Sequence, residues 1–346
     1  MIVKKEVFGK TSEGMEVNLY KLINVNSMCA RIINYGAILV SLEVPGRNGV
    51  CTDIILGYDN LEQYIADNST YFGATVGRYA GHIVGGRFTL DGTEYTLAKN
   101  DGSNHLHGGN RGFNKVIWSA QEIKSPGETG VKLTYLSKDG EEGYPGNLNV
   151  TVKYTLTDNN ELQISYKAET DKPTPVSLTH HSYFNLAGHN CGDILSHELM
   201  IDADYFNPAN PDLAPTGEIK SVKDTPMDFT QPLTIGSRIG DVPGGYDHNY
   251  VLNDTSTSLT LAAIVKEPMT GRKMEVYTTE PALQLYTGNF LDGKIKGKEG
   301  AIYKKHDALC LETQQFPDAP NKPQFPPAII KPGQKYIQKT VYKIVT

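Results

Sequence analysis

The sequence predicts an all-β fold, a large antiparallel β-sandwich. Runs rich in Val, Ile, Thr and Tyr follow one another at residues 116–123, 130–137, 147–157 and 161–170. Turn signals rather than crossover helices separate these runs, which favours antiparallel sheets. Helical periodicity is scarce. The one short helix we expect lies in "DNLEQYIADN", residues 59–68, with Asp59 or Asn60 as its N-cap.

Two hairpins and a last strand complete the prediction. "GRFTLDGTEYTLA" alternates on both sides of Asp91-Gly92, a dipeptide typical of tight hairpin turns. A second hairpin turns at residues 158–160. A Pro-rich stretch, residues 312–333, leads into a strand in "KYIQKTVYKIV". Since no linker or fixed-period repeat divides the chain, we expect a single domain over residues 1–346.

Composition and charge narrow the classes of partner. The chain has 346 residues and a formal net charge of −6, with no basic block. This argues against nucleic acid and against an anionic membrane surface as partners. No stretch is long enough to span a bilayer, and the N-terminus is charged early, so we expect a cytoplasmic protein. The four cysteines are far apart and form no CxxC, which suggests free buried thiols: Cys29, Cys51, Cys191 and Cys310.

Two adjacent histidines occur in "TPVSLTHHSYFNLAGH", residues 174–189. Side chains alternate between the two faces of a strand. His181 therefore shares a polar face with Thr179, Tyr183 and Asn185, and this face is expected to line a cleft. His180 belongs to the mostly apolar face, where we expect a structural hydrogen bond.

A second histidine pair lies in "SNHLHGG". In an extended segment, His105 and His107 would point to one face, and such a pair can hold a metal. The glutamate of a cupin-type metal site does not follow. We therefore favour two hydrogen-bonding imidazoles at a strand end.

Glu312 stands in an apolar strand, "ALCLETQQ". Desolvation there would raise the pKa of its carboxyl group. The residues alone leave two readings open, a buried partner of an arginine and a general base. Asp247, after a Gly-Gly turn, either caps its own backbone or belongs to a site. Gln284 and Tyr286 form a polar strip that suits sugar hydroxyls.

The common catalytic motifs are missing. The sequence holds no Walker A motif, no G-x-S-x-G and no GxGxxG that leads into a helix. The remaining candidates are His, Glu, Asp, Gln, Asn and Tyr. This set suits proton transfer on a neutral polyol.

Eight segments, in order along nearly the whole chain, resemble blocks of the aldose 1-epimerase (galactose mutarotase) family. They are "GATVGRYAGHI", "NHLHGG", "RGFNKVIW", "DGEEGYPGNL", "TPVSLTHHSYFNLAG", "GYDHNYVL", "PALQLYTGNF" and "CLETQQFPDAPNKPQFPP". The resemblance implies a galactose mutarotase-like supersandwich with an open sugar cleft. It also implies interconversion of the α and β anomers of galactose or glucose, without a cofactor or metal.

The resemblance assigns roles to single residues. Glu312 falls on the family's general base and His181 on its general acid. Three residues fall on sugar-binding positions, and a fourth sits near the acid: His107, Asp247, Gln284 and Tyr183. The chain departs from the family at "GRYAGHI", where Gly81 replaces an asparagine and His82 an arginine that contacts the sugar. Arg78 has the same strand parity as His82, so we expect both to reach the sugar. His180 also departs, since it replaces the family's usual asparagine.

A carboxylate beside His181 is expected to favour the imidazolium and so to raise its pKa. Three rival functions stay open: a phosphosugar epimerase, a non-catalytic sugar-binding module, and a metal-dependent β-fold enzyme that uses His105 and His107. The expected partner is a small aldose, bound by a monomer or homodimer.

Overall fold

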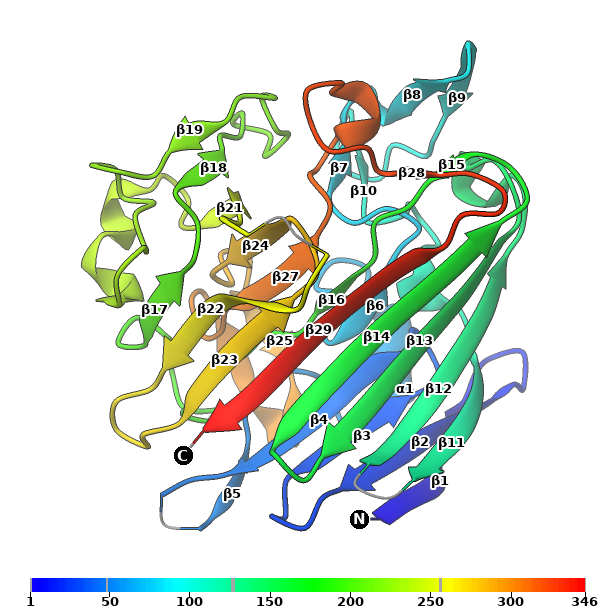
Figure 1. Ribbon diagram of the computed structural model, residues 1–346. Helices are drawn as coiled ribbons and strands as arrows, with labels where there is room; N and C mark the ends of the chain where they lie inside the picture. Colours follow the sequence, from blue (N-terminus) through cyan, green and yellow to red (C-terminus); the bar gives the residue numbers. More distant parts are fainter. Residues whose placement is uncertain (1, 48, 126–127, 255–256, 346) are drawn as a thin grey trace.

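A nine-stranded antiparallel sheet forms one layer of the molecule (Figure 1). The computed structural model describes residues 2–47, 49–125, 128–254 and 257–345. In spatial order the strands are β11 (Ser119–Ser125), β12 (Glu128–Ser137), β13 (Leu148–Thr157), β14 (Glu161–Thr170), β29 (Tyr336–Val345), β23 (Lys273–Thr278), β22 (Thr260–Lys266), β17 (Glu198–Ile201) and β20 (Leu233–Thr234). Strands β11 to β14 are neighbours both in sequence and in the sheet, as the predicted turns require, whereas β29 joins β14 from the C-terminus.

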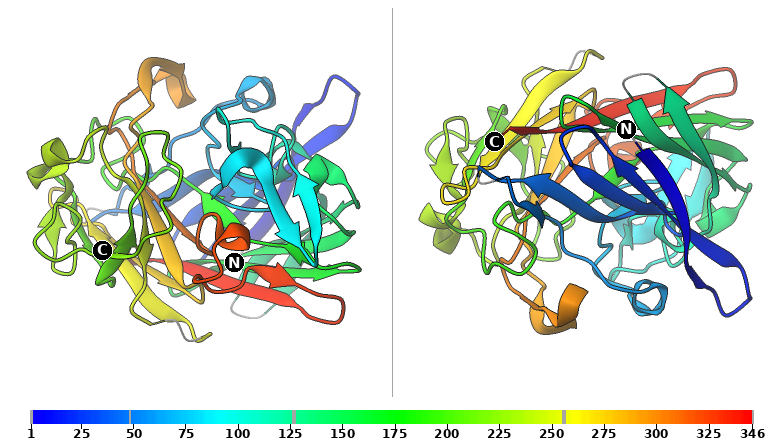
Figure 2. Two further views of the ribbon diagram at one scale, coloured as in Figure 1. Left: turned by 90° about the horizontal axis from the view of Figure 1, so that it is seen from above. Right: turned by 90° about the horizontal axis from the view of Figure 1, so that it is seen from below.

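A five-stranded N-terminal sheet packs against this layer (Figure 2). Alternate residues of β13, such as Val150, Val152 and Tyr154, share a core cluster with Leu22 and Ile32 of the N-terminal sheet. The two sheets thus bury their apolar faces against each other. The strands are β1 (Ile2–Lys10), β2 (Glu16–Ile23), β3 (Cys29–Ile33), β4 (Ile38–Pro45) and β5 (Cys51–Asp53).

A third sheet carries three of the predicted site residues, Asp247, Gln284 and Glu312. Its order is β19 (Lys220–Ser221), β18 (Tyr205–Asn207), β21 (Asp247–Val251), β24 (Ala282–Tyr286) and β27 (Cys310–Gln314). Leu283 and Leu285 of β24, and Leu311 of β27, enter the main core. Since faces alternate, Gln284 and Glu312 point away from that core.

Five pairs of short strands lie outside these three sheets in the described residues. They are β6 (Ala74–Val76) with β16 (Thr179–His181), β7 (His82–Ile83) with β10 (His105–Leu106), β8 (Arg87–Leu90) with β9 (Thr93–Thr96), β15 (Thr174–Pro175) with β28 (Ile329–Ile330), and β25 (Asp292–Lys296) with β26 (Ile302–Lys304). The single α-helix of the described residues is α1 (Leu61–Ala66). The 3₁₀ turns span Val84–Gly86, Phe113–Lys115, Glu141–Gly143, Ile235–Ser237, Ile239–Asp241, Lys298–Gly300 and Ala319–Asn321.

The local predictions are confirmed. Asn60 caps α1, where its side chain accepts a hydrogen bond from the Gln63 amide. The first hairpin turns at Asp91 and Gly92, both with positive φ. The four cysteines are free, but only two are buried: Cys191 is exposed and Cys51 partly so, which corrects that expectation.

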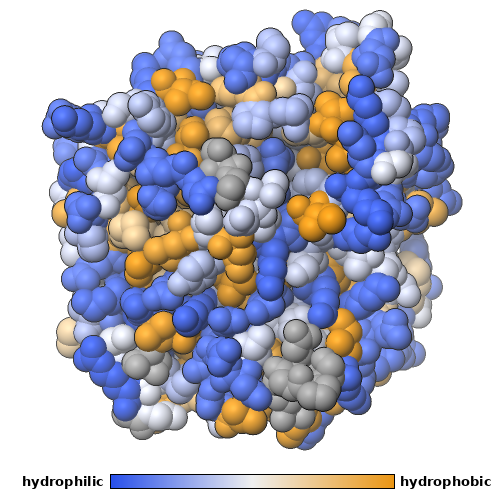
Figure 3. Space-filling view, in the orientation of Figure 1, coloured by the Kyte–Doolittle hydropathy of each residue, from blue (hydrophilic) through white to orange (hydrophobic). Residues whose placement is uncertain are grey.

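The surface in Figure 3 is largely hydrophilic, with separate groups of hydrophobic residues. Among the described residues, no helix is both long and apolar enough to cross a bilayer.

Candidate active site

A cavity of about 500 Å³ opens beside the third sheet. This volume suits a small ligand. Side chains from β16, from the third sheet and from the segment around β7 and β10 line it. Seven of the eight predicted site residues line it: His82, His107, His181, Tyr183, Asp247, Gln284 and Glu312. Among the described residues, no Lys or Arg lines the cavity.

Glu312 lies on β27, next to β24 and one strand further from β21. It lies opposite Gln284, and Gln284 lies opposite Asn249 on β21. The Gln284 amide Nε2 donates to Asp247 Oδ1 at 2.7 Å. Glu312 is 2% exposed, and its Oε2 has no hydrogen-bond partner among the described residues. No arginine pairs with it there, so the reading of Glu312 as an arginine's partner is not supported.

His181 faces Glu312 from β16, which lies beside β27 (Figure 1). Its Nε2 is 3.6 Å from Glu312 Oε1. Its other nitrogen, Nδ1, is 3.5 Å from Cys310 Sγ. Two tyrosine rings stack on the imidazole with near-parallel planes, Tyr183 at 5.1 Å and Tyr71 at 5.7 Å between ring centroids. The ring is therefore fixed in its plane and in its direction.

Burial sets the protonation of this pair. It lowers the pKa of His181 to about 4. It raises the pKa of Glu312 well above its ordinary value, and the negative charge of Asp247 raises it further. The expectation that a nearby carboxylate raises the His181 pKa is therefore wrong: desolvation of the imidazolium outweighs the attraction. Burial also raises the pKa of Asp247 to about 6, against the hydrogen bond from Gln284.

His107 presents a donor to the cavity. The residue has φ 52°, and its Nδ1 accepts a hydrogen bond from the Gly81 amide at 3.1 Å. A neutral imidazole that accepts at Nδ1 carries its proton on Nε2. Burial lowers the pKa of His107 well below 6.5, so the ring stays neutral.

The tautomer of His107 decides how well the cleft suits a metal. One possible ligand atom from each of His107, His181 and Glu312 lies within 4.8 Å of the others. A metal needs a lone pair on each ligand, but the Gly81 amide already occupies the lone pair of His107. In a metal site built from these three residues, His107 would present an N–H instead of a lone pair. The three side chains therefore fit a hydroxyl oxygen better than a cation.

His82 reaches the cavity from β7 and is paired there. Its Nε2 lies 2.8 Å from Asp101 Oδ2, and this contact lowers the pKa of Asp101.

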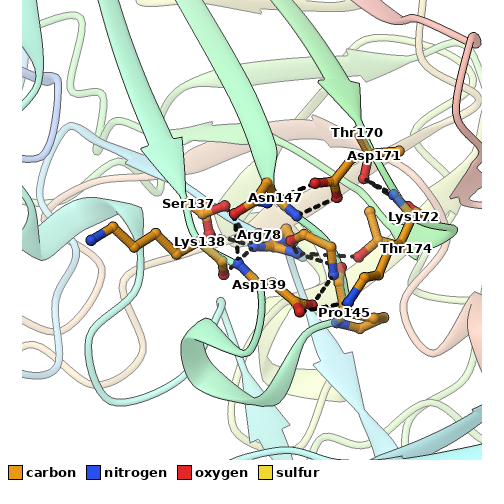
Figure 4. A network of polar contacts seen from close by, with 11 residues as sticks. Arg78, Ser137, Lys138, Asp139, Pro145, Asn147, Thr170, Asp171, Lys172 and Thr174 are labelled. Carbon is orange, nitrogen blue, oxygen red and sulfur yellow. Dashed lines mark hydrogen bonds and ion pairs between the residues drawn. The ribbon is translucent and has the colours of Figure 1, made fainter.

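Arg78 does not reach the cavity, which corrects the prediction that it binds sugar. It is 2% exposed and donates to the carbonyl oxygens of Pro145, Gly146 and Lys138 (Figure 4). The parity argument fails because the segment is not extended: Gly81 has φ 76°, and β7 begins only at His82. The chain therefore turns between Arg78 and His82.

Two further expectations about histidines need correction. His180 does face the core, against Tyr154 and Tyr342, but neither of its ring nitrogens has a hydrogen-bond partner among the described residues. His105 does not share a face with His107. Its nitrogens meet the Ala98 carbonyl and the Tyr144 hydroxyl, because the left-handed conformation of His107 breaks the alternation.

The polar face of the histidine strand reaches the cavity only in part. His181 and Tyr183 line it, whereas Thr179 and Asn185 are fully buried away from it. Asn185 instead donates to the carbonyls of Gly192 and Asp307.

The sequence reasoning missed several lining residues. Asn249 and Gln314 stand two positions from Asp247 and Glu312 on the same strands, so alternation alone could have found them. Tyr71 and Asp101 lie in loops, where no periodic signal exists.

Fold and cleft together define a β-sandwich protein with a buried histidine–glutamate pair in a polar cleft. The family profile described as "Aldose 1-epimerase" matches residues 18–343, and the chain belongs to this family.

Galactose mutarotase of Bos taurus is 46% identical over 342 residues, covering 99% of this chain and 98% of the relative. Galactose mutarotase of Homo sapiens is 45% identical over 343 residues, with 99% and 98% covered. The crystal structure of an aldose epimerase homologue from C. elegans superposes with a TM-score of 0.88 at 30% identity, covering 95% of this chain and 99% of that one.

Proposed function

We propose that this protein is an aldose 1-epimerase that interconverts the α and β anomers of galactose or glucose. One observation carries the proposal: the His181 Nε2 and Glu312 Oε1 atoms, 3.6 Å apart, face one polar cavity of about 500 Å³. Mutarotation requires both a group that takes a proton from the C1 hydroxyl and a group that gives one to the ring oxygen.

In the proposed mechanism, the Glu312 carboxylate takes the proton of the C1 hydroxyl while the His181 imidazolium protonates the ring oxygen. The C1–O5 bond breaks and leaves an open aldehyde. Rotation about C1–C2 turns the other face of the carbonyl toward the C5 hydroxyl. On closure, His181 takes the C5 hydroxyl proton and Glu312 returns a proton to O1.

The pair holds one proton throughout this cycle. In the reactive sugar complex, just before ring opening, the proton is on His181. In the open-chain complex, as in the free protein, it is on Glu312. The raised pKa of Glu312 and the lowered pKa of His181 favour this single-proton state over a wide pH range. The faces of Tyr71 and Tyr183 stabilise the transient imidazolium by about 0.5–2 kcal/mol each at most.

The other lining groups hold the sugar in register. The proposed contacts are an N–H from His107 Nε2, the carboxylate of Asp247, the amide of Gln284 and the imidazole of His82. Their mixed donors and acceptors match sugar hydroxyls, and fixing the sugar contributes through orientation.

Particular observations weigh against the three rivals. A phosphosugar needs cations, but the described cavity is lined by Asp101, Asp247 and Glu312 without a Lys or Arg. A binding module gains nothing from burying Glu312 with one oxygen unpartnered. A metal enzyme built on His105 and His107 fails because His105 points away from the cavity.

The test is polarimetry of freshly dissolved α-D-galactose and α-D-glucose. The protein should speed the decay to the anomeric equilibrium, and EDTA should leave the rate unchanged. If it accelerates neither sugar but does accelerate mutarotation of glucose 6-phosphate, the phosphosugar epimerase replaces this proposal.

We further propose that residues 1–346 act as one domain, because lining residues come from segments as distant as Tyr71 and Gln314. We also propose a cytoplasmic enzyme that works as a monomer or homodimer.

A further inference from the structure

Cys310 lies beside His181, the proposed general acid, and has no role in the proposed mechanism. Cys310 is fully buried on β27, and its Sγ lies 3.5 Å from His181 Nδ1. It stands two residues before Glu312, so both side chains project from the same face of the strand toward His181. One strand therefore positions the groups on both nitrogens of the imidazole.

The thiol is a neutral partner. Burial raises the pKa of Cys310 well above its ordinary value, and the charges of Glu312 and Asp247 raise it further. The sulfur is therefore a thiol and not a thiolate. A thiol sulfur accepts a hydrogen bond only weakly.

The geometry on the other side of the ring selects the tautomer. Burial favours the protonated form of the Glu312 carboxyl group in the free protein, and its Oε1 lies 3.6 Å from His181 Nε2. A neutral imidazole that faces a carboxylic acid is expected to turn its lone pair toward it. The remaining proton of a neutral imidazole is on Nδ1, the nitrogen that faces Cys310 Sγ.

We propose that Cys310 is a positioning residue for His181: its sulfur accepts the Nδ1–H, which keeps Nε2 as the nitrogen that exchanges a proton with Glu312 and the sugar. The proposal rests on the proposed acid role of His181. A carboxylate at this position would stabilise the imidazolium and weaken the acid. A neutral sulfur fixes the tautomer without that stabilisation.

The experiment reads the tautomer directly, by long-range ¹H–¹⁵N NMR of the histidines in the wild type, Cys310→Ala and Cys310→Ser. The wild type should show His181 as the Nδ1–H tautomer. Cys310→Ala should show a mixture, with kcat about tenfold lower and KM unchanged, because the sugar contacts remain. Cys29→Ala is the matched control, since Cys29 is also buried (3% exposed) but lies on β3 outside the cleft.

Cys310→Ser separates a role in tautomer control from a role in packing. A hydroxyl is a stronger acceptor than a sulfur, so Ser should keep the Nδ1–H tautomer and move the acid limb of the kcat/KM profile to higher pH. If the pH profile of kcat/KM in Cys310→Ser is the same as in the wild type, the proposal is overturned. This result decides the proposal even if Cys310→Ala does not fold. So would an Nε2–H tautomer in the wild type, or a wild-type tautomer in folded Cys310→Ala. The NMR readout does not depend on activity. An inactive wild type therefore refutes the proposed function and leaves this test intact.

Discussion

Arg78→Met tests whether Arg78 supports the fold rather than the sugar. In the structure, Arg78 Nη1 donates to the carbonyls of Pro145 at 2.9 Å and Gly146 at 3.0 Å. Its Nη2 donates to the Ser137 hydroxyl at 2.6 Å and to the Lys138 carbonyl at 3.3 Å. The guanidinium thus ties β12 to the loop before β13 (Figure 4).

The expected loss of stability follows from these contacts. Methionine would leave the carbonyls of Pro145 and Gly146 without this donor, at about 2 kcal/mol each. It would also remove the hydrogen bonds to the Ser137 hydroxyl and the Lys138 carbonyl, at about 1 kcal/mol each, since the Lys138 carbonyl still accepts from the Glu141 amide. The substitution also removes the cost of burying the charged guanidinium, which offsets part of this loss of stability. Burial lowers the pKa of Arg78 to about 10, which corresponds to roughly 3 kcal/mol. The free energy of unfolding should therefore fall by about 3 kcal/mol.

The assay is urea unfolding followed by fluorescence of Trp118, the single and fully buried tryptophan. Folded Arg78→Met should keep the KM for galactose within about twofold. Arg31→Met is the control, because its ion pair with Glu43 is partly exposed and is worth at most about 1 kcal/mol. If Arg78→Met keeps the wild-type free energy of unfolding but has a KM for galactose raised about tenfold, the reasoning is refuted, and Arg78 binds the sugar after all.

The remaining predictions concern the three cleft and strand histidines. The pH profile of kcat/KM should have an acid limb near pH 4, where a second proton binds the His181–Glu312 pair and removes the base. Its alkaline limb should lie where the pair loses its shared proton. A fall centred near pH 6.5 would mean that an ordinary histidine controls the rate. His180→Asn should change kcat by less than about threefold, because this ring faces Tyr154 and Tyr342; a loss as large as that of His181→Ala would contradict the facing. His82→Arg should lower the KM for galactose, since a guanidinium pairs with Asp101 and adds donors; a higher KM would show that the cavity is shaped around the imidazole.

The sequence predicted what alternation controls. The opposite facing of His180 and His181 was predicted from strand parity. In the structure the same alternation also projects Gln284 and Glu312 away from the core. His180 and His181 lie on β16, and Gln284 and Glu312 on β24 and β27, where the register of each strand pair fixes the direction of its side chains.

Parity failed where the backbone leaves the extended conformation. Positive φ at Gly81 and at His107 separates Arg78 from His82 and His105 from His107. The direction of the His181 pKa shift was also missed, because desolvation depends on what surrounds the ring in space. Tyr71, for example, comes from a distant loop.

The central claim is that His181 and Glu312 act as one unit that shares a proton. The most direct test is the kcat for galactose of His181→Gln, Glu312→Gln and the double variant, measured by polarimetry or by NMR exchange between the anomers. Each single change should lower kcat by about 10²–10⁴, and the double variant should be no slower than the slower single variant. Losses that multiply in the double variant would contradict the claim, because they would show two groups acting independently.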